Sequence, residues 1–196
     1  MIYPDIYAEF GPYDMLLPWK DTIAMQRLVA PKAEVAPILT SGYPFARAYE
    51  SDYPAAWQRA QILESVAGGA RGFGYWGVCP HDAADFKAVA ETVKLLKPVE
   101  DILLHAAPTA AWHDAAGQVF VKGVATAEAA VLLVSDYSSL SKTARVRHDG
   151  LQQTITVKDL ETGLEIATVS AATPEFTVEL TGNRTRLFHL QKKVSE

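Results

Sequence analysis

The sequence lacks several features that would place it in particular classes of protein. It has one cysteine, Cys79, in 196 residues, which excludes an intrachain disulfide and a metal site built on several cysteines. It has no basic excess, since 18 lysines and arginines stand against 23 acidic residues, so nothing favours binding to nucleic acid or to an anionic membrane surface. Its apolar runs fall far short of the ~20 residues that a bilayer span needs.

Other absences narrow the chemistry. The chain does not open with a basic segment followed by an apolar one, so we expect neither a signal peptide nor a membrane anchor, and a cytoplasmic location. The five histidines show no HxxxH or HxH spacing, and we expect no metal and no cofactor. Cys79 and His81 flank Pro80, but the sequence supplies no orienting group or oxyanion hole for a nucleophilic pair. The glycines between 68 and 77 precede and interrupt a strand, which argues against a dinucleotide site.

What is present is ordinary globular composition, with 49% hydrophobic residues, and a change of pattern near residue 108. Residues 1–106 alternate short apolar runs with helical patterns, which is typical of βα units around a parallel sheet. The predicted strands are Met1–Tyr7, Val35–Leu39 and Gly72–Trp76. The predicted helices are Pro18–Ala30, a helix from Pro54 to the Gly68-Gly69 pair, a helix from Asp82 to Pro98 and a short helix within Val99–Leu104. In the third helix, Phe86, Val89, Val93 and Leu96 recur at helical spacing until Pro98 interrupts the pattern.

Residues 109–194 contain alternating or β-branched runs and no helical pattern. They predict an all-β antiparallel sandwich, with the boundary at Ala106 to Thr109. Asp149-Gly150, Thr162-Gly163 and Gly182-Asn183 supply turn residues. The arginines 145, 147, 184 and 186 are interpreted as solvent-facing positions of strands. Seven strands are expected: Val119–Val124, Ala130–Val134, Ala144–Arg147, Thr154–Val157, Glu165–Val169, Phe176–Leu180 and Arg186–Leu190.

Three βα units do not make a finished domain, because both edges of their parallel sheet stay open. The fold class predicted is therefore an α/β partial (βα)8-type barrel followed by the sandwich. We expect the open edges to be covered by a second copy of the chain, as a homo-oligomer, or by an N-terminal barrel portion that precedes this sequence. In such barrels the functional groups lie on the loops that follow the strands.

Two groups of segments carry a resemblance to a known family. Gly72-Phe73-Gly74-Tyr75-Trp76-Gly77 reads as a final barrel strand, preceded by a helix over 56–64. Val134–Ser138, Val157–Gly163, Phe176–Leu180 and Arg186–Leu190 read as strands of an accessory sandwich. The chain resembles the C-terminal portion of a TIM-barrel glycoside hydrolase, its last three βα units and appended β-sandwich. The resemblance implies an enzyme that cleaves glycosidic bonds of a carbohydrate.

The sequence departs from that family at one important place. The commonest clan of retaining barrel glycosidases carries a nucleophilic glutamate at the end of the seventh strand, where this chain reads Leu39-Thr40-Ser41-Gly42. The general acid of that clan comes from a fourth strand outside the three units predicted here. An inactive fragment of a larger glycosidase, or a non-catalytic carbohydrate-binding or assembly module, is therefore the alternative to an active enzyme.

Glycoside hydrolysis needs two carboxyl groups about 5 to 10 Å apart. Glu50 is the candidate acid or base, because Tyr49 and Tyr53 flank it and aromatic surroundings raise a carboxyl pKa. Asp5 is its candidate ionised partner at the end of the first strand, and Glu9 follows four residues later. Each of these carboxylates taken singly also fits a solvated loop position.

Aromatic and polar side chains near the same strand ends are the candidate sugar contacts. Trp76 is the expected platform, because sugars stack their C–H faces on exposed indole rings, although a buried tryptophan fits the same pattern. The other candidate substrate-binding residues are Tyr7, Tyr43, Tyr75, Arg47 and His81.

Overall fold

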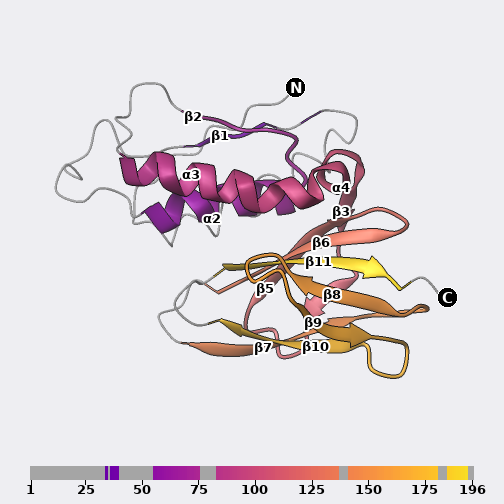
Figure 1. The fold of residues 1–196 in the computed structure, drawn as a ribbon. Helices are drawn as coiled ribbons and strands as arrows, with labels where there is room; N and C mark the ends of the chain where they lie inside the picture. Colours follow the sequence, from indigo (N-terminus) through magenta and orange to yellow (C-terminus); the bar gives the residue numbers. More distant parts are fainter. Residues whose placement is uncertain are drawn as a thin grey trace. The chain divides into compact units, whose positions relative to one another are not determined.

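The computed structural model describes residues 34, 36–39, 55–75, 83–136, 141–180 and 185–193. The chain divides into two compact units, Met1–Pro98 and Val99–Glu196. Over the described residues the structure is mostly antiparallel sheet with few helices (Figure 1).

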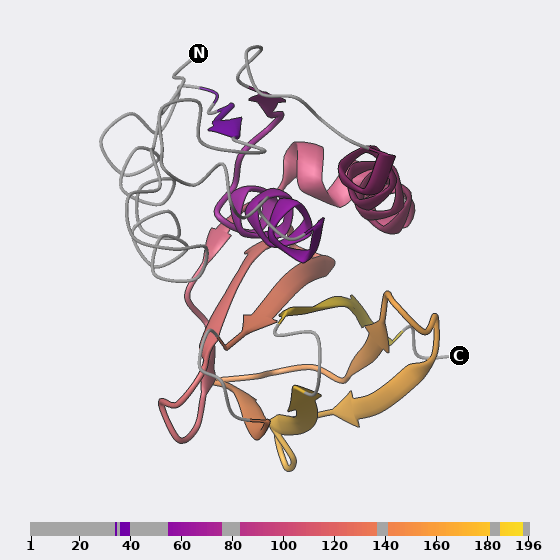
Figure 2. The ribbon, with the colours of Figure 1, turned by 90° about the vertical axis from the view of Figure 1, so that its left-hand side faces the viewer.

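The first unit carries a parallel strand–helix–strand arrangement. Its elements are β1 (Ile38–Leu39), α2 (Ala55–Ala67), β2 (Gly74–Tyr75) and α3 (Ala83–Leu96). β1 and β2 pair in parallel, with Leu39 opposite Tyr75, and α2 lies in the crossover that a parallel pair requires. α2 and α3 pack against each other and are seen end-on in Figure 2. The predicted elements at 1–7 and 18–30 lie outside the described residues.

α2 ends at Ala67, immediately before the Gly68-Gly69 pair. The Gly69 N–H donates to the Val66 carbonyl and the Ala70 N–H to the Ser65 carbonyl, each at 3.0 Å. Gly69 has a φ of 94°, a conformation that glycine adopts without steric cost. These two bonds form a Schellman motif, which satisfies carbonyls at the helix end. The predicted stop at Gly68-Gly69 is confirmed.

α3 buries polar as well as apolar side chains. Phe86 and Val93 are 64% and 47% exposed, whereas Asp85, Thr92 and Leu96 are buried. The Thr92 hydroxyl donates to the Ala88 carbonyl at 2.6 Å, so its burial leaves no unsatisfied hydroxyl. The helix predicted from the apolar spacing is confirmed. Of the residues that carry that spacing, Leu96 is buried, whereas Phe86 and Val93 are exposed.

The second unit contains a short helical entry and nine strands among its described residues. η2 (Lys97–Val99) leads across the division between the units into α4 (Glu100–His105), and α4 contacts β5 and β6. A six-stranded sheet has the order β3 (Ala107–Thr109), β5 (Phe120–Ala125), β6 (Ala129–Ser135), β11 (Thr185–Lys192), β8 (Ile155–Asp159), β9 (Glu165–Val169). A three-stranded sheet has the order β10 (Glu175–Leu180), β7 (Lys142–His148), β4 (Trp112–Asp114).

Both sheets are antiparallel and contribute to one core. Trp112 and Phe176 of the smaller sheet and Phe188 of the larger one form a chain of edge-to-face contacts, with ring centroids 6.0 and 5.6 Å apart. Gly123 allows β5 and β6 to approach closely, because a Cβ there would lie 2.3 Å from the Val131 carbonyl oxygen. Leu132, Val146 and Val157 fill the same core and are fully buried.

The seven strands predicted for this unit are confirmed within one or two residues at each end. Gly150 and Gly163 have positive φ values of 73° and 71°, as their predicted turns require. The Gly182-Asn183 turn lies outside the described residues. β3 and β4 were not predicted, because three-residue strands show too little alternation to be detected.

Candidate functional site

Most of the predicted site residues lie in segments that the structure does not describe. Tyr75 is the exception. The others, outside the described residues, are the carboxylates Asp5, Glu9 and Glu50 and the candidate sugar contacts Tyr7, Tyr43, Arg47, Trp76 and His81. Their grouping stays a prediction.

The strand register bears on that grouping. The chain leaves β1 after Leu39 and leaves β2 after Tyr75, and these two residues are partners in the parallel pair. The segments that follow the two strands therefore begin at neighbouring positions on one edge of the sheet. Glu50 belongs to the segment after β1, and Trp76 is the first residue after β2.

Tyr75 is partly buried at the end of β2. Its ring makes an edge-to-face contact with Phe73, at 6.1 Å between centroids and 87° between planes. Burial raises the pKa of the Tyr75 hydroxyl above its ordinary range, and the Asp85 carboxylate of α3 raises it further. The hydroxyl therefore stays protonated and is able to donate a hydrogen bond.

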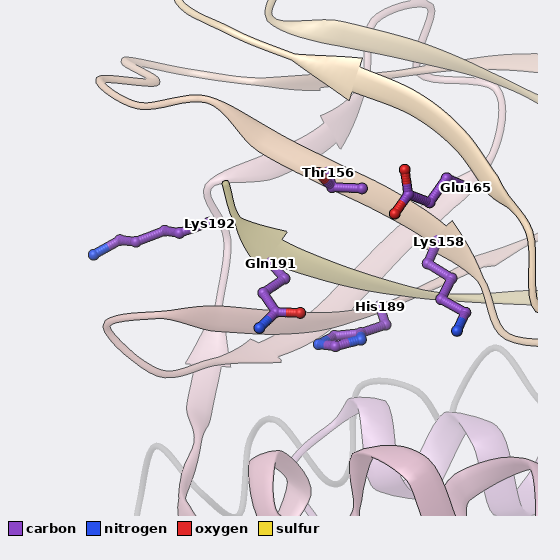
Figure 3. Close-up of a pocket in the computed structure, with 6 residues that line it drawn as sticks. All are labelled: Thr156, Lys158, Glu165, His189, Gln191 and Lys192. Atoms are coloured by element: carbon purple, nitrogen blue, oxygen red, sulfur yellow. The ribbon is translucent and has the colours of Figure 1, made fainter. Parts of the chain in front are cut away.

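A polar pocket lies on the six-stranded sheet of the second unit (Figure 3). It has a volume of about 110 Å³ and is lined by Thr156, Lys158, Glu165, His189, Gln191 and Lys192. The sequence patterns did not predict this pocket. Its residues come from three strands, and their assembly depends on the pairing of β11 with β8 and of β8 with β9, which alternation within one strand does not reveal.

An ion pair with a fully buried carboxylate stands at the end of β8. Asp159 is fully buried and pairs with Arg186, whose guanidinium also lies 4.0 Å from the Glu161 carboxylate. The prediction that Arg186 faces solvent is wrong, because it neutralises this carboxylate. Arg145 and Arg147 are exposed as predicted, and Arg184 lies outside the described residues.

Among the described residues, no group of three or more histidine, cysteine, aspartate or glutamate side chains is placed to hold a metal ion. Within the same part of the chain, no helix combines the length and the apolar character needed to cross a membrane.

Comparison with known proteins identifies the fold. No family model matches the sequence, and neither does any curated protein. An α-amylase from Anoxybacillus matches with a TM-score of 0.59 and 11% identity, over 96% of this chain and 47% of that one. An α-amylase from Geobacillus thermoleovorans in complex with acarbose matches with a TM-score of 0.59 and 9% identity, over 98% of this chain and 53% of that one. A family 5 glycoside hydrolase from Bacteroides vulgatus matches with a TM-score of 0.57 and 13% identity, over 96% of this chain and 47% of that one.

The solved structures that match are glycoside hydrolases, and at 9% to 13% identity the likeness concerns the fold alone. The chain spans about half the length of the solved structures it matches. The predicted resemblance to part of a glycoside hydrolase is therefore confirmed at the level of the fold.

Proposed function

We propose that the chain forms part of a glycoside hydrolase, which cleaves glycosidic bonds of a carbohydrate substrate. The observation that carries this proposal is the match of nearly the whole chain, 96% to 98% of it, to several glycoside hydrolases. In this interpretation the first unit supplies about three βα units of a partial (βα)8-type barrel. Substrate then binds at the edge where the segments after β1 and β2 begin.

The proposed roles follow from the chemistry of glycoside hydrolysis. Glu50 acts as the acid or base and Asp5 as its ionised counterpart, with Glu9 as a further candidate. Trp76 forms the platform for a sugar ring, and Tyr75 donates its protonated hydroxyl. Tyr7, Tyr43, Arg47 and His81 are the remaining proposed sugar contacts.

A panel of nitrophenyl glycosides tests this proposal. We expect the chain to hydrolyse at least one of them, and Glu50→Gln and Asp5→Asn each to lower the rate by ~100-fold or more, since a positioned acid or base contributes at least that factor. Glu91→Gln and Asp101→Asn are matched controls, because both residues are exposed in α3 and α4, and they should retain the rate. Equal losses in candidate and control variants would contradict the assigned roles.

A second candidate function is a non-catalytic carbohydrate-binding or assembly module. The departure at the end of β1, where Thr40-Ser41-Gly42 follows Leu39, favours it, and so does the match to only about half of each enzyme. Absence of hydrolysis over the whole panel, with saturable binding of a sugar, would support this candidate over the first.

A further inference from the structure

The polar pocket on the six-stranded sheet is formed by side chains from three neighbouring strands, β8, β9 and β11. In the pairing of β8 with β11, Lys158 lies opposite His189 and Thr156 opposite Gln191. Glu165 of β9 lies opposite Lys158. Register partners project from the same face of a sheet, so these five side chains share the outer face, while Val157 and Leu190 point into the core.

The charges of the pocket balance. The Lys192 ammonium lies 3.0 Å from the Glu128 carboxylate, and Figure 3 shows its side chain extending away from the others. Lys158 and Glu165 carry opposite charges on facing positions. Burial lowers the pKa of His189, and the adjacent Lys158 lowers it further, so its imidazole is neutral at pH 7. A pocket without net charge offers a free anion little attraction.

Several hydrogen-bond donors and acceptors of the pocket have no partner among the described residues. Among the described residues, the side chains of Thr156, Lys158, Glu165, His189 and Gln191 make no hydrogen bond or ion pair with one another or with other groups. They offer an ammonium donor, carboxylate acceptors, and amide, hydroxyl and imidazole groups that provide both kinds. Such a mixture suits a ligand whose every polar group also donates and accepts, which is the property of a sugar hydroxyl.

The size of the pocket limits the ligand. The pocket's volume of about 110 Å³ lies well below the ~300 Å³ at which ordinary small-molecule sites begin. One sugar ring, partly exposed, fits this space, whereas a buried oligosaccharide does not. The described residues that line the pocket include no tyrosine, tryptophan or phenylalanine, so recognition relies on hydrogen bonds at the edge of the ring.

We propose that this pocket binds a single uncharged sugar unit of a carbohydrate chain through its hydroxyl groups. The site lies wholly within the second unit and is distinct from the proposed catalytic residues. It goes beyond the proposed catalytic function, and it names a specific site for the sugar binding that the second candidate function involves.

Amide chemical shifts of the full-length, ¹⁵N-labelled chain test the proposal. The probes are the methyl glycosides of glucose, galactose and N-acetylgalactosamine, each to ~50 mM, a range that detects millimolar dissociation constants. We expect at least one to produce saturable shifts at the amides of Thr156, Lys158, His189 and Gln191. Inorganic phosphate at matched ionic strength should leave these amides unshifted.

Two matched variants complete the test. Gln191→Ala should weaken binding by about fivefold, the effect of one net hydrogen bond. Gln152→Ala changes an exposed glutamine in the same unit that does not line the pocket, and should bind as the wild type does. No shift with any sugar, phosphate shifts at the same amides, or equal affinity of Gln191→Ala and wild type would overturn the proposal. Shifts confined to the first unit would also overturn it, while supporting the proposed function.

Discussion

A single carboxylate, Asp159, holds the end of β8 and the turn that follows it. One of its oxygens accepts the Glu161 N–H at 2.8 Å and the Thr162 N–H at 3.4 Å, and the other accepts from Arg186. Arg186 in turn donates to the Glu179 carbonyl at 3.3 Å. Asp159 is fully buried, so the loss of its cationic partner would leave a charge in a medium that solvates it poorly.

We therefore expect Arg186→Met to lower the free energy of unfolding by about 3 kcal/mol, the lower end of the range for breaking a buried pair. Urea denaturation followed by circular dichroism measures the change. Arg145→Met is the matched control, because Arg145 is mostly exposed and lies 3.9 Å from the Glu175 carboxylate, and its loss should stay within about 0.5 kcal/mol. Similar losses in both variants would contradict the role assigned to Asp159.

His189 predicts a pH dependence of stability. Its folded-state pKa is lowered by burial and by Lys158. As the pH falls through the ordinary value of 6.5, the unfolded chain therefore binds more protons at this residue than the folded chain does. Stability from this residue is present above that value and is lost as the solution is acidified. Urea denaturation at pH 7.5 and pH 5.5, both chosen to bracket the ordinary histidine pKa of ~6.5, should show a smaller loss in His189→Gln than in wild type. His105→Gln, at an exposed position of α4, should keep the wild-type loss.

At the scale of elements, sequence patterns located the strands better than they identified the buried residues of a helix or the residues of a pocket. Alternation and the turns at Gly150 and Gly163 located the strands of the second unit, because both signals are local. Helical spacing did not identify which residues of α3 are buried, because Thr92 bonds its hydroxyl within the helix and is buried, whereas Val93 is exposed. The pocket around His189 was not predicted, because it depends on the register between strands that are distant in sequence.

At the scale of the whole molecule, the two units are expected to differ in their dependence on partners. The second unit has its own core, drawn from both of its sheets. We expect limited thermolysin digestion to release a resistant C-terminal fragment that begins before Ala107, because β3 pairs with β5 and protects the segment that follows. Mass spectrometry of the fragment identifies the cleavage site and tests the predicted boundary at Ala106 to Thr109. General degradation without such a fragment would contradict an independent second unit.

We expect the chain to self-associate through its first unit. It has a short parallel strand pair and exposes Phe86 and Val93 on α3, and such apolar surface favours association. We expect light scattering of the purified chain to give a mass above that of one chain, rising with concentration. A monomer mass that does not change with concentration would contradict this prediction.

The position of β11 in the larger sheet sets an order of events during synthesis. It comes after β5, β6, β8 and β9 along the chain, yet it lies between β6 and β8. The hairpins β5–β6 and β8–β9 emerge first from the ribosome and have no shared strand until residues 185–192 follow. Folding of this sheet therefore waits for the last strand. A chain cut after Leu180 should show no dispersed amide signals from the second unit, whereas one cut after Lys193 should keep them.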